Sequence, residues 1–253
     1  MSTPMQIGFS QRVQLDWLEQ TAALVLAGQT REQVETTLQE RLRDKLSIGG
    51  TAQRGNREKA ITILLKIWVS VPTWLQLLRD DGLGHLQRLP PADHIAVHWG
   101  MIMAAYPFFS AVAETVGRLM RLQGTCAAAQ IQRRIREHLG ERETVARAAR
   151  RILRCFIDWG VLQETREKGV YQASPARPVQ DKQLAAWLIE AALLAQSTDT
   201  SVLQTLLQTP TLFPFRIPQL YAADLEGQGR VETFRQGLDE DMVTLRVPSE
   251  TNG

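Results

Sequence analysis

The amino-acid sequence predicts a mainly α-helical protein built from three parts. Apolar residues recur at three- and four-residue steps through most of the chain, as they do on the buried faces of helices. Between residues 108 and 174 the expected order is helix, helix, turn, helix and hairpin, which is the order of a winged helix-turn-helix. Strand-like segments gather near the C-terminal end. We therefore expect a helical domain over 1–105, a winged helix domain over 106–178, and a small α+β portion of helices and short strands over 179–253.

The bulk composition is that of an ordinary globular protein, but the charge is unevenly distributed. The 253 residues are 44% hydrophobic and 22% charged, with a net charge of +2. From Arg118 to Arg154 there are ten Arg and three Glu, a local net charge of +7, so the rest of the chain carries −5. The small total therefore conceals a basic block in the middle of the chain.

Several features point to a soluble, cytoplasmic protein. Cys126 and Cys155 lack C-x-x-C spacing, which favours a reducing compartment over a disulfide framework. The first residues do not follow the charged-then-apolar order of a secretory signal. The longest apolar stretches, "ITILLKIWVSV" and "LAAWLIEAALLA", are too short or too interrupted to span a bilayer. We expect no membrane partner.

The N-terminal part is predicted to be entirely helical. Two helices are expected within residues 10–46, with Thr30 and Gln33 as a capping box at the start of the second. A strongly apolar helix should follow over 57–71, and Pro72 should begin another. The glycines and prolines of "DDGLGHLQRLPP" indicate a break, after which a helix begins at Pro91–Asp93 and ends before Pro107.

The central and C-terminal elements follow from the same reasoning. Helices are expected over 108–123, 127–139 and 143–159, with a tight turn at "GERE" and short strands in "GVLQET" and "GVYQAS" around the "REKG" turn. Further helices should cover 181–196 and 200–208. "LFPFRI" and "MVTLRV" are strand-like, and "DLEGQGR" and "RQGLDED" are turn-rich.

The long helix at 143–159 contains the strongest functional signal. Its apolar stripe includes Val145, Ala149, Ile152 and Phe156, and a cluster of arginines should lie opposite. Like charges at this spacing repel one another, and a nucleic-acid phosphate backbone would relieve the repulsion. The candidate nucleic-acid-binding residues are the arginines of this helix, two arginines of the preceding helix that would flank the backbone, and a lysine at the tip of the hairpin: Arg147, Arg150, Arg151, Arg154, Arg133, Arg134 and Lys168.

Two other interpretations of the basic helix stay open. Glu137, Glu141 and Glu143 could neutralise part of a merely solvated face. Winged helices also serve as protein-docking modules, because a fold does not determine its function. A DNA binder should carry a continuous basic stripe, whereas a docking module should expose an apolar patch.

The remaining candidate sites do not support catalysis, a metal or a cofactor. His94 and His98 lie four residues apart, but we expect a pair of ordinary helix histidines, since a zinc site needs a third ligand. The acidic run 239–241 is expected to be a solvated turn. No phosphate-binding glycine loop, dinucleotide fingerprint or nucleophile elbow occurs. An enzyme with an unrecognised site is the third hypothesis.

The order of elements resembles a known family. A helical N-terminal part, "YPFFSAVAETVGRLM" leading into a helix, and a long arginine-bearing helix ending in "WGVL" are similar to the BrxA family of BREX phage-defence systems, over residues 10 to 170. The resemblance implies a small, nearly all-helical protein with helix-turn-helix parts, an association with DNA and no known catalytic residues. The tail, with "LFPFRIPQLY", extends beyond it.

The sequence therefore predicts a non-enzymatic DNA-binding component of a bacterial multi-gene system, such as phage defence. Its expected partners are DNA and other protein subunits of the same system. The alternative is a scaffold whose winged helix docks another protein during subunit assembly.

Overall fold

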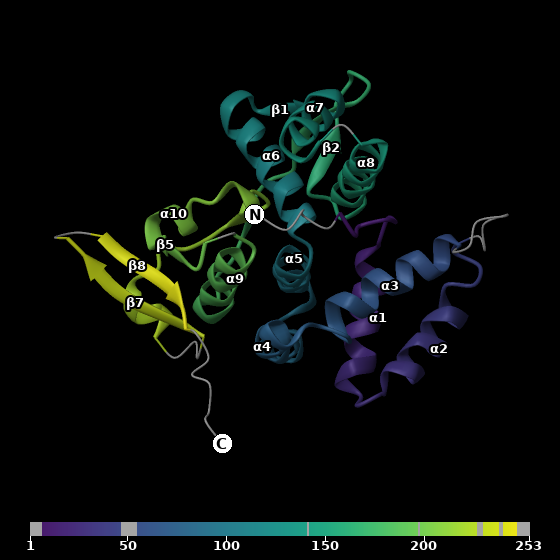
Figure 1. Cartoon of the computed structure of the whole chain (residues 1–253), viewed down its shortest axis with the longest axis horizontal. Helices are drawn as coiled ribbons and strands as arrows, with labels where there is room; N and C mark the ends of the chain where they lie inside the picture. The colour runs from purple at the N-terminus through teal and green to yellow at the C-terminus, as the bar shows by residue number, and fades with distance from the viewer. Residues whose placement is uncertain are drawn as a thin grey trace.

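The fold is mainly helical, with small sheets in its central and C-terminal parts (Figure 1). The computed structural model describes residues 7–46, 55–140, 142–196, 198–226, 230–237 and 240–246. Figure 1 shows α5 near the middle of the molecule, with α1 to α3 on one side of it and α9 on the other.

The N-terminal part contains five α-helices among its described residues: α1 (Leu15–Leu26), α2 (Arg31–Arg41), α3 (Asn56–Trp68), α4 (Gln76–Arg88) and α5 (His94–Ala105). Short 3-10 turns, η1 (Thr73–Leu75) and η2 (Pro91–Asp93), precede α4 and α5. The predicted capping box of α2 is confirmed. The Gln33 amide donates to Thr30 Oγ1 at 3.4 Å, and the Thr30 amide donates to Gln33 Oε1 at 2.8 Å.

The predicted break at "DDGLGHLQRLPP" is wrong in its first half, because α4 continues to Arg88. Glycine in a helix interior costs about 1 kcal/mol relative to alanine, which is why the sequence suggested a break. Tertiary packing outweighs that cost here. A Cβ at Gly82 would lie 3.0 Å from the ring of Trp187, so the glycine lets α9 approach α4 closely.

The central part follows the predicted order, with one added strand. It runs α6 (Pro107–Gln123), β1 (Thr125–Ala127), α7 (Ala128–Leu139), α8 (Glu143–Asp158), β2 (Leu162–Glu164) and β3 (Val170–Ala173). The three strands form one antiparallel sheet in the order β1-β3-β2. Strand β1 was not predicted, since three residues are too few to show a two-residue period. The predicted turn at "GERE" includes residue 141, which lies outside the described residues.

The C-terminal part contains a helix and several short strands: β4 (Arg177–Pro178), α9 (Lys182–Leu194), β5 (Thr200–Val202), α10 (Leu203–Leu207), η3 (Pro210–Leu212), β6 (Phe215–Arg216), α11 (Ala222–Leu225), β7 (Val231–Gln236) and β8 (Glu240–Leu245). Strands β5, β8 and β7 form an antiparallel sheet, and β4 pairs with β6 in parallel.

Several C-terminal predictions need correction. The expected helix at 200–208 begins as strand β5, because its backbone pairs with the distant strand β8. The strand expected in "LFPFRI" is only two residues long. The turn-rich "DLEGQGR" begins within α11, whereas "RQGLDED" contains the end of β7, a turn at Gly237 and the start of β8. Glu240 and Asp241 of the acidic run 239–241 lie in β8 and not in the expected solvated turn, and residue 239 lies outside the described residues. Pairing between segments far apart in sequence decides where the strands form.

A continuous hydrophobic core joins the three parts of the chain. Trp99 of α5 is fully buried and stacks on Phe156 of α8, with ring centroids 4.9 Å apart. Its ring also contacts Phe215 edge-on, and its indole N–H donates to the Thr211 carbonyl at 3.0 Å. One aromatic side chain therefore contacts the central helix and the C-terminal part together.

The described residues include no single helix that is long and apolar enough to cross a bilayer. By length and composition alone, two bent helix pairs, Asn56–Trp68 with Thr73–Arg88 and Pro91–Ala105 with Pro107–Gln123, meet the requirement together. They bend by 64° and 117° respectively, and many of their apolar side chains lie in the core.

Candidate nucleic-acid interface

Helix α8 has the two faces that its sequence predicts. Val145, Ala149, Ile152 and Phe156 are buried, and each has a relative exposure of 0%. On the opposite side, Arg147, Arg150 and Arg154 are exposed. These three side chains form a basic stripe along the helix, and we call them the α8 stripe.

Arg151 does not belong to the exposed stripe, although the sequence placed it there. Its side chain is only partly exposed. Burial lowers the pKa of its guanidinium, and the positive charges of Arg147 and Arg150 lower it further. Arg151 therefore lies at the edge of the stripe, in an environment with an excess of positive charge.

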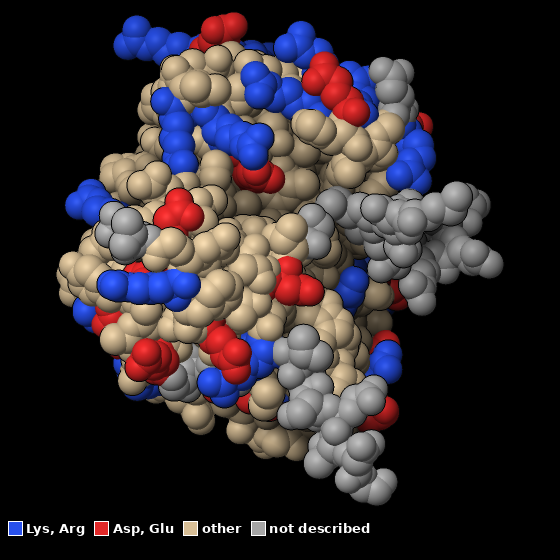
Figure 2. All heavy atoms as spheres, turned by 60° about the vertical axis from the view of Figure 1, so that its left-hand side comes forward, with Lys and Arg blue, Asp and Glu red and all other residues tan. Residues whose placement is uncertain are grey.

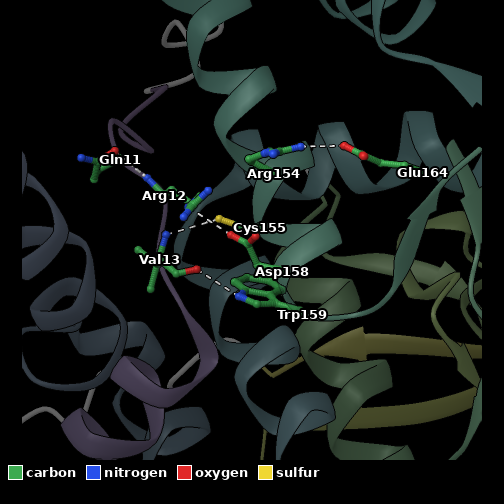
Figure 3. A network of polar contacts seen from close by, with 8 residues as sticks. All are labelled: Gln11, Arg12, Val13, Arg154, Cys155, Asp158, Trp159 and Glu164. Atoms are coloured by element: carbon green, nitrogen blue, oxygen red, sulfur yellow. Dashed lines mark hydrogen bonds and ion pairs between the residues drawn. The ribbon is translucent and has the colours of Figure 1, made fainter. Parts of the chain in front are cut away.

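Two members of the stripe already have carboxylate partners. Arg147 pairs with Glu143 one turn earlier, and Arg154 Nη1 lies 2.8 Å from Glu164 Oε1 of β2 (Figure 3). Both pairs are exposed to solvent, where an ion pair contributes only about 0–1 kcal/mol. These arginines could therefore exchange their carboxylates for phosphates at little cost. Arg150 has no carboxylate within ion-pair distance in the described ranges.

The other predicted residues lie on α7 and in the β2-β3 turn, and both α7 and β2 contact α8. Arg133 of α7 is exposed and lies 3.7 Å from Glu137, whereas Arg134 is partly buried. Lys168 is exposed in the turn between β2 and β3. Figure 2 shows Lys and Arg side chains gathered over the upper part of the molecule, at the height where Figure 1 places α6, β1 and α7. Basic side chains thus extend beyond α8 itself.

A segment that the sequence analysis missed packs along α8. We call residues 7–14, which precede α1, the N-terminal strap. The Val13 amide donates to Cys155 Sγ at 3.4 Å, and the Trp159 indole N–H donates to the Val13 carbonyl at 3.0 Å (Figure 3). Arg12 also pairs with Asp158 at 3.0 Å. The strap contains too few apolar residues for any periodicity to reveal it.

The strap keeps one flank of α8 fixed to the rest of the protein. Phe9, fully buried, contacts Tyr106 edge-on with ring centroids 5.4 Å apart.

Cys155 and Cys126 are buried and free, as expected, and burial raises the pKa of each thiol to about 12. Neither thiol is a nucleophile at neutral pH.

The histidine pair of α5 lies beside a carboxylate of α1. His94 Nδ1 lies 2.8 Å from Glu19 Oε1, and His98 Nε2 lies 3.1 Å from the same oxygen. His94 Nε2 is 3.0 Å from the Leu89 carbonyl. Burial is the main cause of the lowered pKa of His98. No group of three or more His, Cys, Asp or Glu suited to a metal ion occurs in the part of the chain that the structure describes.

Comparison with protein-family models, with curated proteins and with solved structures finds no match to this chain. Any function is therefore inferred from the geometry of α7, α8 and the β2-β3 hairpin, together with the charges that they carry.

Proposed function

We propose that residues 107–173 form a winged helix-turn-helix that binds DNA through α8. The observation that carries this proposal is the element order α6-β1-α7-α8-β2-β3, with the strands arranged β1-β3-β2. In such an arrangement α7 and α8 are the helix-turn-helix, and the β2-β3 hairpin is the wing. The second helix of a helix-turn-helix lies in the major groove, which makes α8 the recognition helix.

The charges of this region suit a phosphate backbone. Arg147, Arg150 and Arg154 would approach one groove together, because they share a face of α8. Neutralising phosphates releases condensed counterions, which supplies most of the non-specific affinity for DNA. Arginine can also bind guanine through two hydrogen bonds, so the same stripe has the chemistry for reading bases. Lys168 at the hairpin tip and Arg133 on α7 would contact flanking phosphates.

The wider role follows the resemblance to the BrxA family. We propose a non-enzymatic, cytoplasmic component of a bacterial multi-gene system such as phage defence, whose partners are DNA and other subunits. The two buried, free cysteines are compatible with a reducing compartment.

Fluorescence anisotropy with a random-sequence duplex at several salt concentrations tests the DNA-binding role. The test variant replaces Arg147, Arg150 and Arg154 with Ala. The matched control replaces three exposed arginines of the α2 region, Arg31, Arg41 and Arg43, and so changes the net charge equally. Circular dichroism and thermal unfolding show whether each variant is folded.

We expect salt-sensitive binding by the wild type and by the α2 control, and loss of most of that binding in the α8 variant. Each phosphate that the protein no longer neutralises makes the negative slope of log K against log salt less steep by about 0.9. Loss of three such contacts should therefore make the slope of the variant less steep by about 2.7. If the folded wild type does not bind, or if both variants weaken binding equally, α8 is not a DNA-binding surface.

Protein docking is the second candidate, and one observation favours it. Trp74 of η1 and Leu77 of α4 are 54% and 59% exposed, and two large apolar side chains so close together suit a protein contact. A folded wild type that binds no duplex, and whose association with another subunit is abolished by changing Trp74 and Leu77 to Ser, would establish docking in place of DNA binding.

A further inference from the structure

A cavity lies where the N-terminal strap meets the beginning of α8. It has a volume of about 320 Å³ and is lined by strap residues 7–10, by Lys59 of α3, and by Thr144, Arg147 and Arg151 of α8. Its basic side chains come from two helices that are far apart in sequence. Lys59 was not among the residues that the sequence singled out, because a lone lysine in the first turn of a helix carries no signal.

The charge in this cavity is not balanced by its own walls. The lining residues include three cations and no carboxylate. Arg147 has Glu143 as a partner, but no described carboxylate lies within ion-pair distance of Lys59 or Arg151. The lowered pKa of Arg151 reflects burial and the neighbouring arginines. Three cations around one hollow are stabilised when an anion occupies it.

Two of the other lining residues, Ser10 and Thr144, have hydroxyl groups that can donate to an oxyanion. Thr144 lies in the first turn of α8, at the end of the helix where the positive pole of the helix dipole favours an anion. Arginine and lysine bind phosphate through charge-assisted hydrogen bonds, which are about twice as strong as neutral ones. The volume is at the lower end of the range for small-ligand sites, so it admits a small anion with its immediate substituent.

We propose that this cavity binds a phosphate group, with Lys59, Arg147 and Arg151 as its cationic ligands. The proposal deepens the DNA-binding function and rests on it for the source of the phosphate. The phosphate is either a diester of the duplex that lies along α8 or the monoester at a 5′ end. Lys59 carries the decisive test, because it lies on α3, outside the α8 stripe and outside the proposed helix-turn-helix.

The experiment compares the wild type with Lys59→Gln and with a matched control, Lys45→Gln, which removes the same charge after α2. Three probes are used: inorganic phosphate, a duplex whose ends are closed by hairpin loops, and the same duplex opened to carry 5′ phosphates. Phosphate binding is followed by ³¹P NMR line width and by the rise in Tm. Duplex binding is followed by anisotropy against salt.

The proposal expects phosphate to broaden the ³¹P line and raise the Tm of the wild type and of Lys45→Gln, but not of Lys59→Gln. If the phosphate is a backbone diester, Lys59→Gln should make the dependence of log K on log salt less steep with the closed duplex, by about 0.9, the value for one neutralised phosphate. A weakening confined to the 5′-phosphorylated duplex would assign the cavity to a terminal monoester. A weakening with both duplexes would assign it to the backbone.

The outcomes separate this inference from the function on which it rests. If the wild type binds duplex through the α8 stripe while Lys59→Gln matches Lys45→Gln with every probe, the cavity proposal is overturned and DNA binding stands. If no duplex binds but inorganic phosphate binds in a Lys59-dependent manner, DNA binding falls and the phosphate site stands. If neither probe binds the folded wild type, both are wrong.

Discussion

At the scale of single residues, the start of α9 depends on Asp181. Its Oδ1 accepts the Leu184 amide at 2.8 Å and so caps the helix. The same carboxylate receives two hydrogen bonds from the Arg88 guanidinium, one of them at 3.1 Å. This pairing with Arg88 is the main reason why the pKa of Asp181 falls from 3.8 to about 2. One side chain therefore caps α9 and ties it to α4.

Changing Asp181 separates these two roles. Asp181→Ala loses the cap and the ion pair, and we expect it to cost about 1–2 kcal/mol of unfolding free energy. Asp181→Asn keeps an oxygen that can accept the Leu184 amide, and should cost less than about 1 kcal/mol, as expected for losing an exposed ion pair. Urea denaturation measures both values. Equal losses in the two variants would mean that the cap contributes nothing.

The lowered pKa of Asp181 also predicts a pH dependence. The Asp181 carboxyl has a lower pKa in the folded protein than in the unfolded chain. Its ionised form therefore stabilises the folded state, and this contribution is fully present above pH 3.8. That stabilisation is lost as the pH falls from 3.8 towards about 2, where the unfolded chain takes up the proton first. The stability difference between wild type and Asp181→Asn should therefore shrink over this interval, and a difference that stays constant would contradict the assignment.

At the scale of elements, glycines decide how closely the central helices approach one another. A Cβ on Gly100 of α5 would lie 2.3 Å from the ring of Trp187 on α9. The Trp187 indole N–H in turn donates to the Leu78 carbonyl of α4 at 3.0 Å. The Trp187 ring therefore packs between its own helix α9 and helices α4 and α5, and it has little room to shift. At Gly84 of α4, in contrast, an added Cβ would have no neighbouring atom within 4 Å.

Alanine at these two glycines should have opposite effects. Gly100→Ala forces the Trp187 ring to move, and overpacking of this kind costs about 1–3 kcal/mol. Gly84→Ala meets no atom and improves helix propensity, so it should stabilise the protein by about 0.5–1 kcal/mol. Thermal and urea unfolding of the two variants measure the contrast. Stabilisation by Gly100→Ala would show that α5 and α9 do not pack as described.

At the scale of the whole molecule, polar contacts as well as apolar ones join the parts. Arg230 at the start of the β7 region is 13% exposed and pairs with Glu190 of α9, whose side chain is fully buried. Arg230 Nη2 also lies 2.7 Å from Asp81 of α4. Burial raises the pKa of Glu190 while Arg230 opposes the rise. The C-terminal sheet is thus connected to α4 and α9 through the partly buried guanidinium of Arg230.

Because the core is continuous, we expect unfolding in one cooperative step. Tryptophans 17, 68, 99, 159 and 187 are all buried and lie in the N-terminal, central and C-terminal parts. Their fluorescence and the far-UV circular dichroism should follow coincident urea transitions, which is a test of two-state behaviour. Two separated transitions would instead support the independent domains 1–105, 106–178 and 179–253 that the sequence suggested.

Local patterns in the sequence are enough to predict the long helices and the basic face of α8. A 3.6-residue periodicity that continues over about fifteen residues clearly indicates a helix and not a strand. The ends of α6, α8 and α9 were therefore predicted to within about two residues. The capping box at Thr30 and the stop before Pro107 are local chemistry and were also readable. The exposure of Arg147, Arg150 and Arg154 follows from their spacing against the apolar stripe.

Features that depend on contacts between distant parts of the chain become visible only in the folded structure. Strands β1 and β5 are three residues long, and only pairing with β3 and β8 makes them strands. Gly82 lies inside α4, where the absence of a side chain leaves room for the ring of Trp187 from α9. Arg151 and Lys59 share a cavity, although they are far apart in sequence, because the strap packs against α8. Local patterns record propensity and periodicity, whereas such contacts depend on which surfaces the folded chain brings together.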